Sequence, residues 1–308
     1  MALFGRKSNS ATARQPYRPE AGMVAAPTVP AKSLDFTYDA SGEPAYAIQA
    51  EPAQSGRISL TKAYKAAEEA LINAELPGIR LEVILLVDGS YSMDRLYDDG
   101  TVELLGVRTL GFALNVDIDG KIPVISYGRD VGKPFEVSAS NYKDFGKLLK
   151  RNRQVGNTNM TDALKLAVEI AKKSNKLVLI INITDGDPNN KLTMKNEVIK
   201  LSAYPIMLKN IAIANVPFLA DLDDMPSLIE AETNSDGSYK KTSDGDLILS
   251  RNSEGVRFID SVDSQSIDPR RATDEEFAKA LAEEISECVQ TMARVGLLTN
   301  VPGSVKDF

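Results

Sequence analysis

Residues 79–93 read IRLEVILLVDGSYSM, and this stretch decides the fold. Its unbroken aliphatic run predicts a strand buried on both faces, because a strand with one face in water alternates apolar and polar residues. Similar runs at 176–185 and 204–215 are separated from it by segments with a helical apolar period. Strands that alternate with helices predict an α/β fold whose mainly parallel sheet has helices on both faces. A short hairpin predicted at 121–139 adds one antiparallel edge strand.

The residue types that the chain lacks limit its chemistry. It has no histidine and a single cysteine, Cys288, in 308 residues, which excludes imidazole bases, intrachain disulfides and cysteine-rich zinc sites. Cys288 falls on the apolar stripe of a helix predicted to begin at a Thr273 capping box, so we expect it in the core. The formal net charge of −7 argues against nucleic acid as a partner. The longest apolar run, Val83 to Val87, is far too short to span a membrane, and we expect a cytoplasmic protein.

Two segments differ in composition from the rest of the chain. Residues 1–55 hold six of the 15 prolines and no sustained period, which predicts a flexible arm before a single domain over 56–308. For the role of this arm, a solvated tail and a docking peptide are both open. Residues 233–255 contain three glycine-centred turns around short β-prone pieces and predict an inserted hairpin. Residues 256–260, VRFID, are then expected to form the last strand of the sheet.

Oxygen-bearing side chains gather where two predicted core strands end. Asp88, Ser90 and Ser92 alternate directly after the first strand. Asp185 ends a second strand, and Thr158 precedes a helix. Because the carboxyl ends of parallel strands share one edge of a sheet, we expect these side chains to form a metal site. Mg²⁺ fits best because it prefers octahedral oxygen coordination and keeps several waters, with Mn²⁺ and Ca²⁺ as alternatives. Taken singly, each residue has an alternative role as a helix cap or turn residue.

The order of these motifs resembles a known family. Asp-x-Ser-x-Ser, then Gly-x-Thr and Thr-Asp-Gly, are similar to the metal-ion-dependent adhesion site (MIDAS) of von Willebrand factor A (vWA) domains. Stretches at 93–128, 218–226 and 274–284 resemble the TerF-like branch of bacterial tellurium resistance. The resemblance implies a Rossmann-like vWA fold and a metal held by Asp88, Ser90, Ser92, Thr158 and Asp185. Two features depart from the family pattern: Tyr91, where Gly is usual between the serines, and the segment 233–255.

The resemblance implies that the protein is a binding module and not an enzyme. A metal held mainly by neutral hydroxyls stays electrophilic and takes an Asp or Glu carboxylate from a protein partner. The implied setting is a bacterial or phage stress-response system of the tellurium-resistance type. One alternative is a structural assembly protein of the virion type. A less favoured one, a magnesium-dependent phosphoester hydrolase, lacks a nucleophile and base within the motifs.

Overall fold

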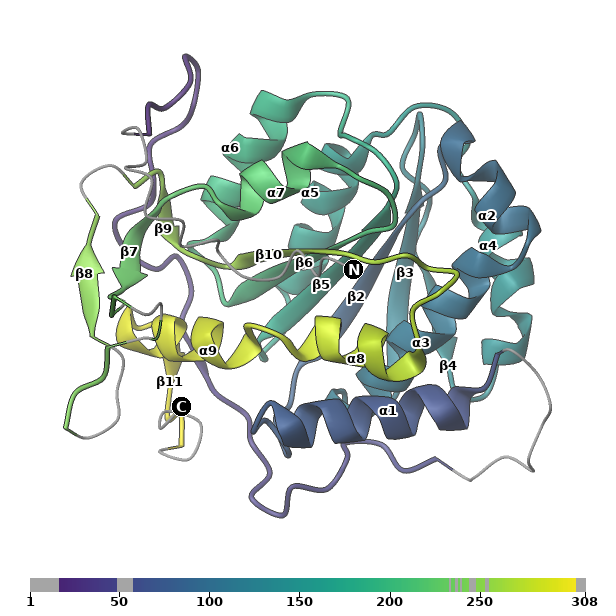
Figure 1. The fold of residues 1–308 in the computed structure, drawn as a ribbon, viewed down its shortest axis with the longest axis horizontal. Coiled ribbons are helices and arrows are strands. Elements are labelled where there is room, and N and C mark those ends of the chain that lie inside the picture. Colours follow the sequence, from purple (N-terminus) through teal and green to yellow (C-terminus); the bar gives the residue numbers. More distant parts are fainter. Residues whose placement is uncertain are drawn as a thin grey trace.

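A six-stranded sheet with the order β10-β6-β5-β2-β3-β4 forms the centre of the molecule (Figure 1). The computed structural model describes residues 17–48 and 58–302, except for 233, 236–237, 239, 244–247 and 253–254. Neighbouring strands run parallel except at β4, which pairs antiparallel with β3 at the edge. The strands are β2 (Glu82–Asp88), β3 (Lys121–Tyr127), β4 (Phe135–Ser138), β5 (Val178–Thr184), β6 (Ile206–Ala212) and β10 (Val262–Ser266). This arrangement confirms the predicted α/β fold and its antiparallel edge strand.

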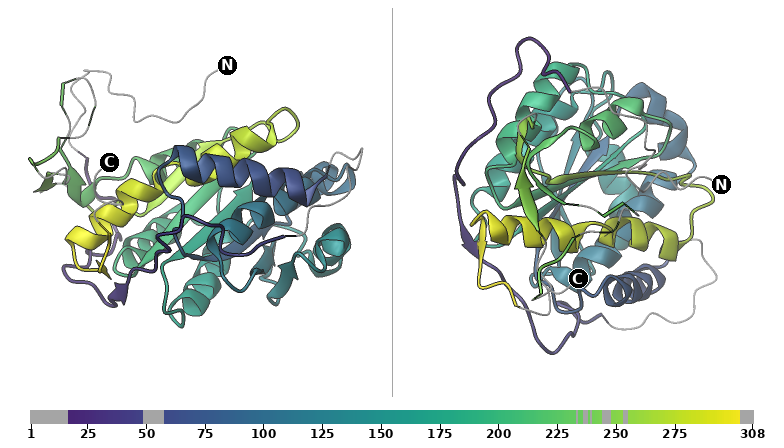
Figure 2. Two further views of the ribbon diagram at one scale, coloured as in Figure 1. Left: turned by 90° about the horizontal axis from the view of Figure 1, so that it is seen from below. Right: turned by 60° about the vertical axis from the view of Figure 1, so that its left-hand side comes forward.

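Helices cover both faces of this sheet (Figures 1 and 2). Along β2, Val83, Leu85 and Val87 pack into one core, whereas Ile84 and Leu86 pack into the other. Burial on both sides explains why this strand is aliphatic without a break. The first core is covered by α1 (Leu60–Asn73), α2 (Asp94–Asp98), α3 (Thr101–Val116), α4 (Phe145–Asn152), α8 (Asp274–Ala282) and α9 (Ile285–Arg294), and the second by α5 (Met160–Ala171), α6 (Lys191–Leu201) and α7 (Pro217–Asp223). Within the described residues, no helix combines the length and apolar character that a membrane crossing needs.

A second, three-stranded sheet corrects two expectations. It consists of β7 (Ser227–Ala231), β8 (Leu249–Arg251) and β9 (Arg257–Ile259), with β7 between the other two. Of the segment 233–255, predicted as an inserted hairpin, only β8 is a named strand, and it pairs antiparallel with β7, which ends before residue 233. Several residues of the connection between them lie outside the described residues. The predicted last strand of the central sheet, 256–260, contributes β9 to this small sheet instead. The last strand of the central sheet is β10, which pairs with β6.

The N-terminal segment also differs from the flexible arm predicted for 1–55. Residues 1–16 and 49–57 lie outside the described residues, but residues 17–48 run along the domain (Figure 2). Within them β1 (Leu34–Asp35) pairs parallel with β11 (Leu298–Thr299), and Phe36 is buried. The Val24 amide donates to Asn196 on α6 over 2.9 Å. An extended segment that contacts the domain at only a few residues shows no helical or strand period in its apolar residues, so the sequence pattern could not predict this packing. The predicted boundary at residue 56 therefore does not separate 17–48 from the domain.

The C-terminal helical region is divided where a single helix was predicted. The expected capping box is present, with Thr273 and Glu276 each accepting the other's backbone N–H. The helix α8 ends at Ala282, and Glu284, with a φ of 60°, turns the chain through the left-handed region before α9. Cys288 is buried in the core, as predicted.

Asp117 links α3 to the start of the sheet. It caps the C-terminus of α3 and is buried, and its Oδ2 accepts the Val83 N–H over 3.2 Å. Burial, reinforced by the charge of Asp119, raises the pKa of the Asp117 carboxyl to about 7. Between pH ~4 and about 7, the Asp117 carboxyl is therefore protonated in the folded protein and ionised in the unfolded chain.

We expect the contribution of Asp117 to the free energy of unfolding to fall as pH rises from about 4 to about 7, because the folded state binds more protons in that window. Asp117→Asn should remove this dependence, so wild type should lose stability relative to the variant over the same range. Urea unfolding at a series of pH values measures the difference. Asp221→Asn, at an exposed carboxylate on α7, is the control. A wild-type-to-variant difference that stays constant from pH 4 to 7 would contradict the prediction.

Candidate metal centre

The carboxyl ends of β2 and β5 bring two acidic residues together. The strands pair in parallel with Val87 opposite Ile183, so Asp88 and the Thr184–Asp185 pair emerge at the same edge. Asp88 is fully buried, and Thr184 Oγ1 donates to its Oδ2 over 2.6 Å. The Asp88 carboxylate is thus fixed by the neighbouring strand before the loop begins.

Four of the five predicted ligands form one connected hydrogen-bond chain. The Ser90 amide donates to Asp88 Oδ1 over 2.8 Å. The hydroxyls of Ser90 and Ser92 lie 3.1 Å apart, and Ser92 Oγ donates to Asp185 Oδ1 over 2.8 Å. Asp88 and Ser90 are buried, whereas Ser92 is exposed. The cluster therefore has a closed base and one side open to solvent.

The fifth residue, Thr158, lies beside this chain without joining it. Two hydrogen bonds tie Thr158 to the loop that follows β5: the Thr158 amide donates to Asn189 Oδ1 over 3.1 Å, and the Asn189 amide donates to the Thr158 carbonyl over 3.0 Å. A Cβ placed on Gly186, directly after Asp185, would lie 3.9 Å from Thr158 Oγ1. The structure thus brings all five predicted residues to one place.

The electrostatics of this cluster suit a cation. Burial raises the pKa of the Asp88 carboxyl, and the nearby Asp185 charge raises it further, while hydrogen bonds from Thr184 and Ser90 act in the opposite direction. Two carboxylates and three hydroxyls are hard oxygen donors, the set that Mg²⁺, Mn²⁺ and Ca²⁺ bind. The donor chemistry of the residues present therefore fits a divalent ion.

Arg153 fixes the loop of this site, and sequence reasoning missed it. Its Nε donates to the Gly89 carbonyl over 2.9 Å, and its Nη2 donates to the Ser90 carbonyl over 2.7 Å and to Asp94 Oδ1 over 2.5 Å. The guanidinium also stacks on the Tyr97 ring, 4.1 Å from the ring centroid. Since these partners lie about sixty positions earlier in the chain, no local motif could have identified Arg153.

Two glycines allow the segment that follows Arg153 to approach the site. A Cβ at Gly89 would lie 2.5 Å from the Gln154 carbonyl oxygen, and one at Gly128 would lie 1.8 Å from it. The Gly89 amide donates to the Tyr127 carbonyl over 2.6 Å. Glycine is thus required at both positions for the backbones to pack.

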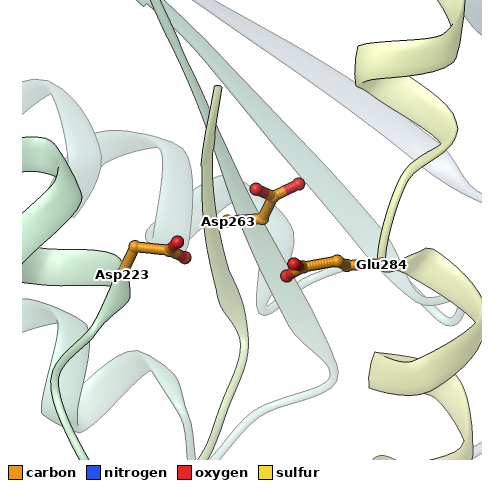
Figure 3. A group of neighbouring side chains, drawn as sticks. All are labelled: Asp223, Asp263 and Glu284. Carbon is orange, nitrogen blue, oxygen red and sulfur yellow. The ribbon is translucent and has the colours of Figure 1, made fainter. Parts of the chain in front are cut away.

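A different acidic cluster is formed by the end of α7, by β10 and by the turn between α8 and α9. Figure 3 shows Asp223, Asp263 and Glu284 turned toward one another, and their carboxylate oxygens lie within 4.8 Å. Lys209, in the middle of β6, donates to Asp263 Oδ2 and, over 2.6 Å, to the Glu283 carbonyl. Burial lowers the pKa of Lys209 to about 8, although the surrounding carboxylates oppose this shift. We assign these carboxylates as counter-ions of Lys209 and not as metal ligands.

A comparison with protein-family models agrees with the fold. A family model described as the vWA domain found in the TerF C terminus matches residues 80–234, half of the chain, and all five predicted ligands lie within it. The chain is similar to the SpRpn10 VWA domain, with a TM-score of 0.43 and 11% identity over 72% of this chain and 100% of that one. It is also similar to manganese-loaded TRAP protein of Plasmodium vivax, with a TM-score of 0.38 and 21% identity over 52% of this chain and 67% of that one. No curated protein matches the chain.

Replacement of Arg153 should destabilise the site loop. We expect Arg153→Ala to lower the free energy of unfolding by about 1–3 kcal/mol, because it leaves buried loop carbonyls without their donor. Arg153→Lys should recover little, since an ammonium cannot span both carbonyls and stack on Tyr97. Chemical denaturation measures both variants, with Arg151→Ala, an exposed arginine of α4, as the control. Equal stability of Arg153→Ala and Arg151→Ala would show that the contacts of Arg153 are not stabilising.

Proposed function

The chain belongs to the family of vWA domains found in the TerF C terminus, and we propose that it is a divalent-metal-dependent protein-binding module. The proposed metal site is the MIDAS-type cluster of Asp88, Ser90, Ser92, Thr158 and Asp185. One observation carries the proposal: the Asp88–Ser90–Ser92–Asp185 hydrogen-bond chain at the carboxyl edge of the sheet, with Thr158 beside it.

The mix of donors supports binding of a partner carboxylate. Because three of the five proposed donors are neutral hydroxyls, which donate less electron density than carboxylates, a divalent ion here stays electrophilic, and Mg²⁺ retains exchangeable water positions. The exposed side of the cluster, at Ser92, gives a partner access to such a position. An Asp or Glu side chain is the ligand that suits a hard, positively charged ion. We propose Mg²⁺ as the ion, with Mn²⁺ and Ca²⁺ as alternatives.

We further propose that the module is not an enzyme and acts in a cytoplasmic stress-response system of the tellurium-resistance type. General acid–base catalysis needs a titratable group that exchanges a proton with the substrate. In the cluster itself the two titratable groups are the carboxylates proposed to bind the metal, and the chain has no histidine. The family description supports the proposed setting.

Metal should stabilise the folded protein. Mg²⁺ at about 100 times its Kd should add ~2.7 kcal/mol to the free energy of unfolding and raise the melting temperature by a few degrees. Asp88→Ala should abolish this shift. It removes one of two repelling carboxylates but also the acceptor of the Thr184 hydroxyl and the Ser90 amide, and because these effects oppose one another the metal-free protein should be about as stable as wild type. Asp187→Ala is the matched control, since this carboxylate lies nearby but pairs with Lys191 over 2.6 Å. Calorimetry that detects no Mg²⁺, Mn²⁺ or Ca²⁺ binding to wild type would refute the metal site.

Partner capture should depend on the same cluster. We expect wild type, used as an affinity bait in host extract, to retain a specific protein in Mg²⁺ and to release it in chelator. Asp88→Ala should retain none of it, whereas Asp187→Ala should behave as wild type. A partner that persists in chelator on Asp88→Ala would show that binding does not use the metal.

A further inference from the structure

Two exposed apolar side chains stand on the loops that build the metal cluster. Tyr91 and Val155 have relative exposures of 64% and 40% and are among the few large apolar side chains that the described residues expose. Tyr91 separates Ser90 from Ser92, and Val155 lies on the loop that leads to Thr158. Single exposed apolar residues are ordinary, but a pair beside an open polar cluster is the composition of a binding surface.

The backbone holds this pair in place. The Tyr91 amide donates to the Gly156 carbonyl over 3.2 Å, so the two loops are joined directly. The Val155 carbonyl accepts the Arg129 amide over 3.3 Å, and Arg153 holds the carbonyl of Ser90. A partner that covers these side chains does not have to order the backbone that carries them, and aromatic side chains are enriched among binding hot spots.

We propose that Tyr91 and Val155 form an apolar rim that receives a large apolar side chain of the partner, located within two positions of its metal-binding carboxylate. This inference rests on the proposed function and defines the partner more narrowly: an acidic residue next to Leu, Ile, Val, Met or an aromatic residue. Exposed Arg129, whose amide is bonded to the Val155 loop, adds positive charge beside the rim and favours an acidic segment.

Spacing along an extended peptide is consistent with this partner. Side chains two positions apart point to the same face and lie about 6–7 Å apart. When a peptide carboxylate binds the metal, the side chain two positions away therefore faces the same surface, where the rim can contact it. Tyr91 stands in the chain between Ser90 and Ser92, and both Tyr91 and Ser92 are exposed, so the backbone that carries the rim also forms the open side of the cluster.

The test is selection of peptides from a random phage-displayed library on the immobilised full chain in Mn²⁺. Wild type should enrich peptides in which Asp or Glu stands within two positions of a large apolar residue. Tyr91→Ser combined with Val155→Ser should still enrich acidic residues but lose the apolar preference, and should bind the best wild-type peptide at least tenfold more weakly. Ile118→Ser is the matched control, because this apolar residue is 49% exposed and lies just before β3, at the amino ends of the strands and away from the metal cluster.

Mn²⁺ affinity and melting temperature of each variant keep the outcomes separate. Both should be unchanged in the Tyr91/Val155 double variant, because neither side chain is buried or belongs to the ligand set. If wild type enriched acidic peptides that show no preference for a neighbouring apolar residue, or if the double variant bound the best peptide as tightly as wild type, the proposed rim would be wrong and the proposed function would stand. If wild type enriched no acidic peptide in a metal-dependent way, both the rim and the proposed function would be wrong.

Discussion

The burial of the Asp88 carboxylate at the end of an aliphatic strand is the constraint on which the site depends. A charged group in that position is costly unless fixed dipoles or a cation compensate it. The Thr184 hydroxyl, which the parallel pairing of β2 with β5 brings close, and the Ser90 amide, two residues after Asp88 in the same loop, supply fixed dipoles. The central strands of the sheet therefore position the loop of the cluster. Its inner members are fixed by these strands, and its outer members are exposed to solvent.

Much of the fold could be predicted because its core obeys simple periodicity. Strands β2 and β5 are mainly aliphatic, β6 is aliphatic on both sides of Lys209 and Asn210, and the five candidate ligands follow strand ends or precede a helix. Strand β10 could not be predicted, because its sequence, VDSQS, is polar. Its side chains are satisfied by partners that only the fold brings close, as in the Asn210–Ser264 hydrogen bond of 3.2 Å. Arg153 was missed for the same reason.

The cluster around Lys209 shows how the same residue types serve a different purpose. There Asp263 accepts a hydrogen bond from the Lys209 ammonium group, and the charges of Asp223 and Glu284 act on the same group. At the sheet edge, by contrast, Asp88 and Asp185 are joined to hydroxyls, which cannot neutralise them. A count of acidic residues alone would favour the Lys209 cluster as the metal site. The identity of the compensating group, and not the number of carboxylates, distinguishes the two places.

The parallel pairing of β1 with β11 has a consequence for synthesis of the protein. The hydrogen bond between Asp35 and Thr299 joins positions 264 residues apart, so nearly the whole chain lies between them. Contacts of such separation form late, because the intervening chain must be ordered first. On the ribosome, β1 emerges before β11 and cannot pair with it until β11 has been made. The pairing of β1 is therefore completed only after the strands of the central sheet have been made, although β1 precedes them in the chain.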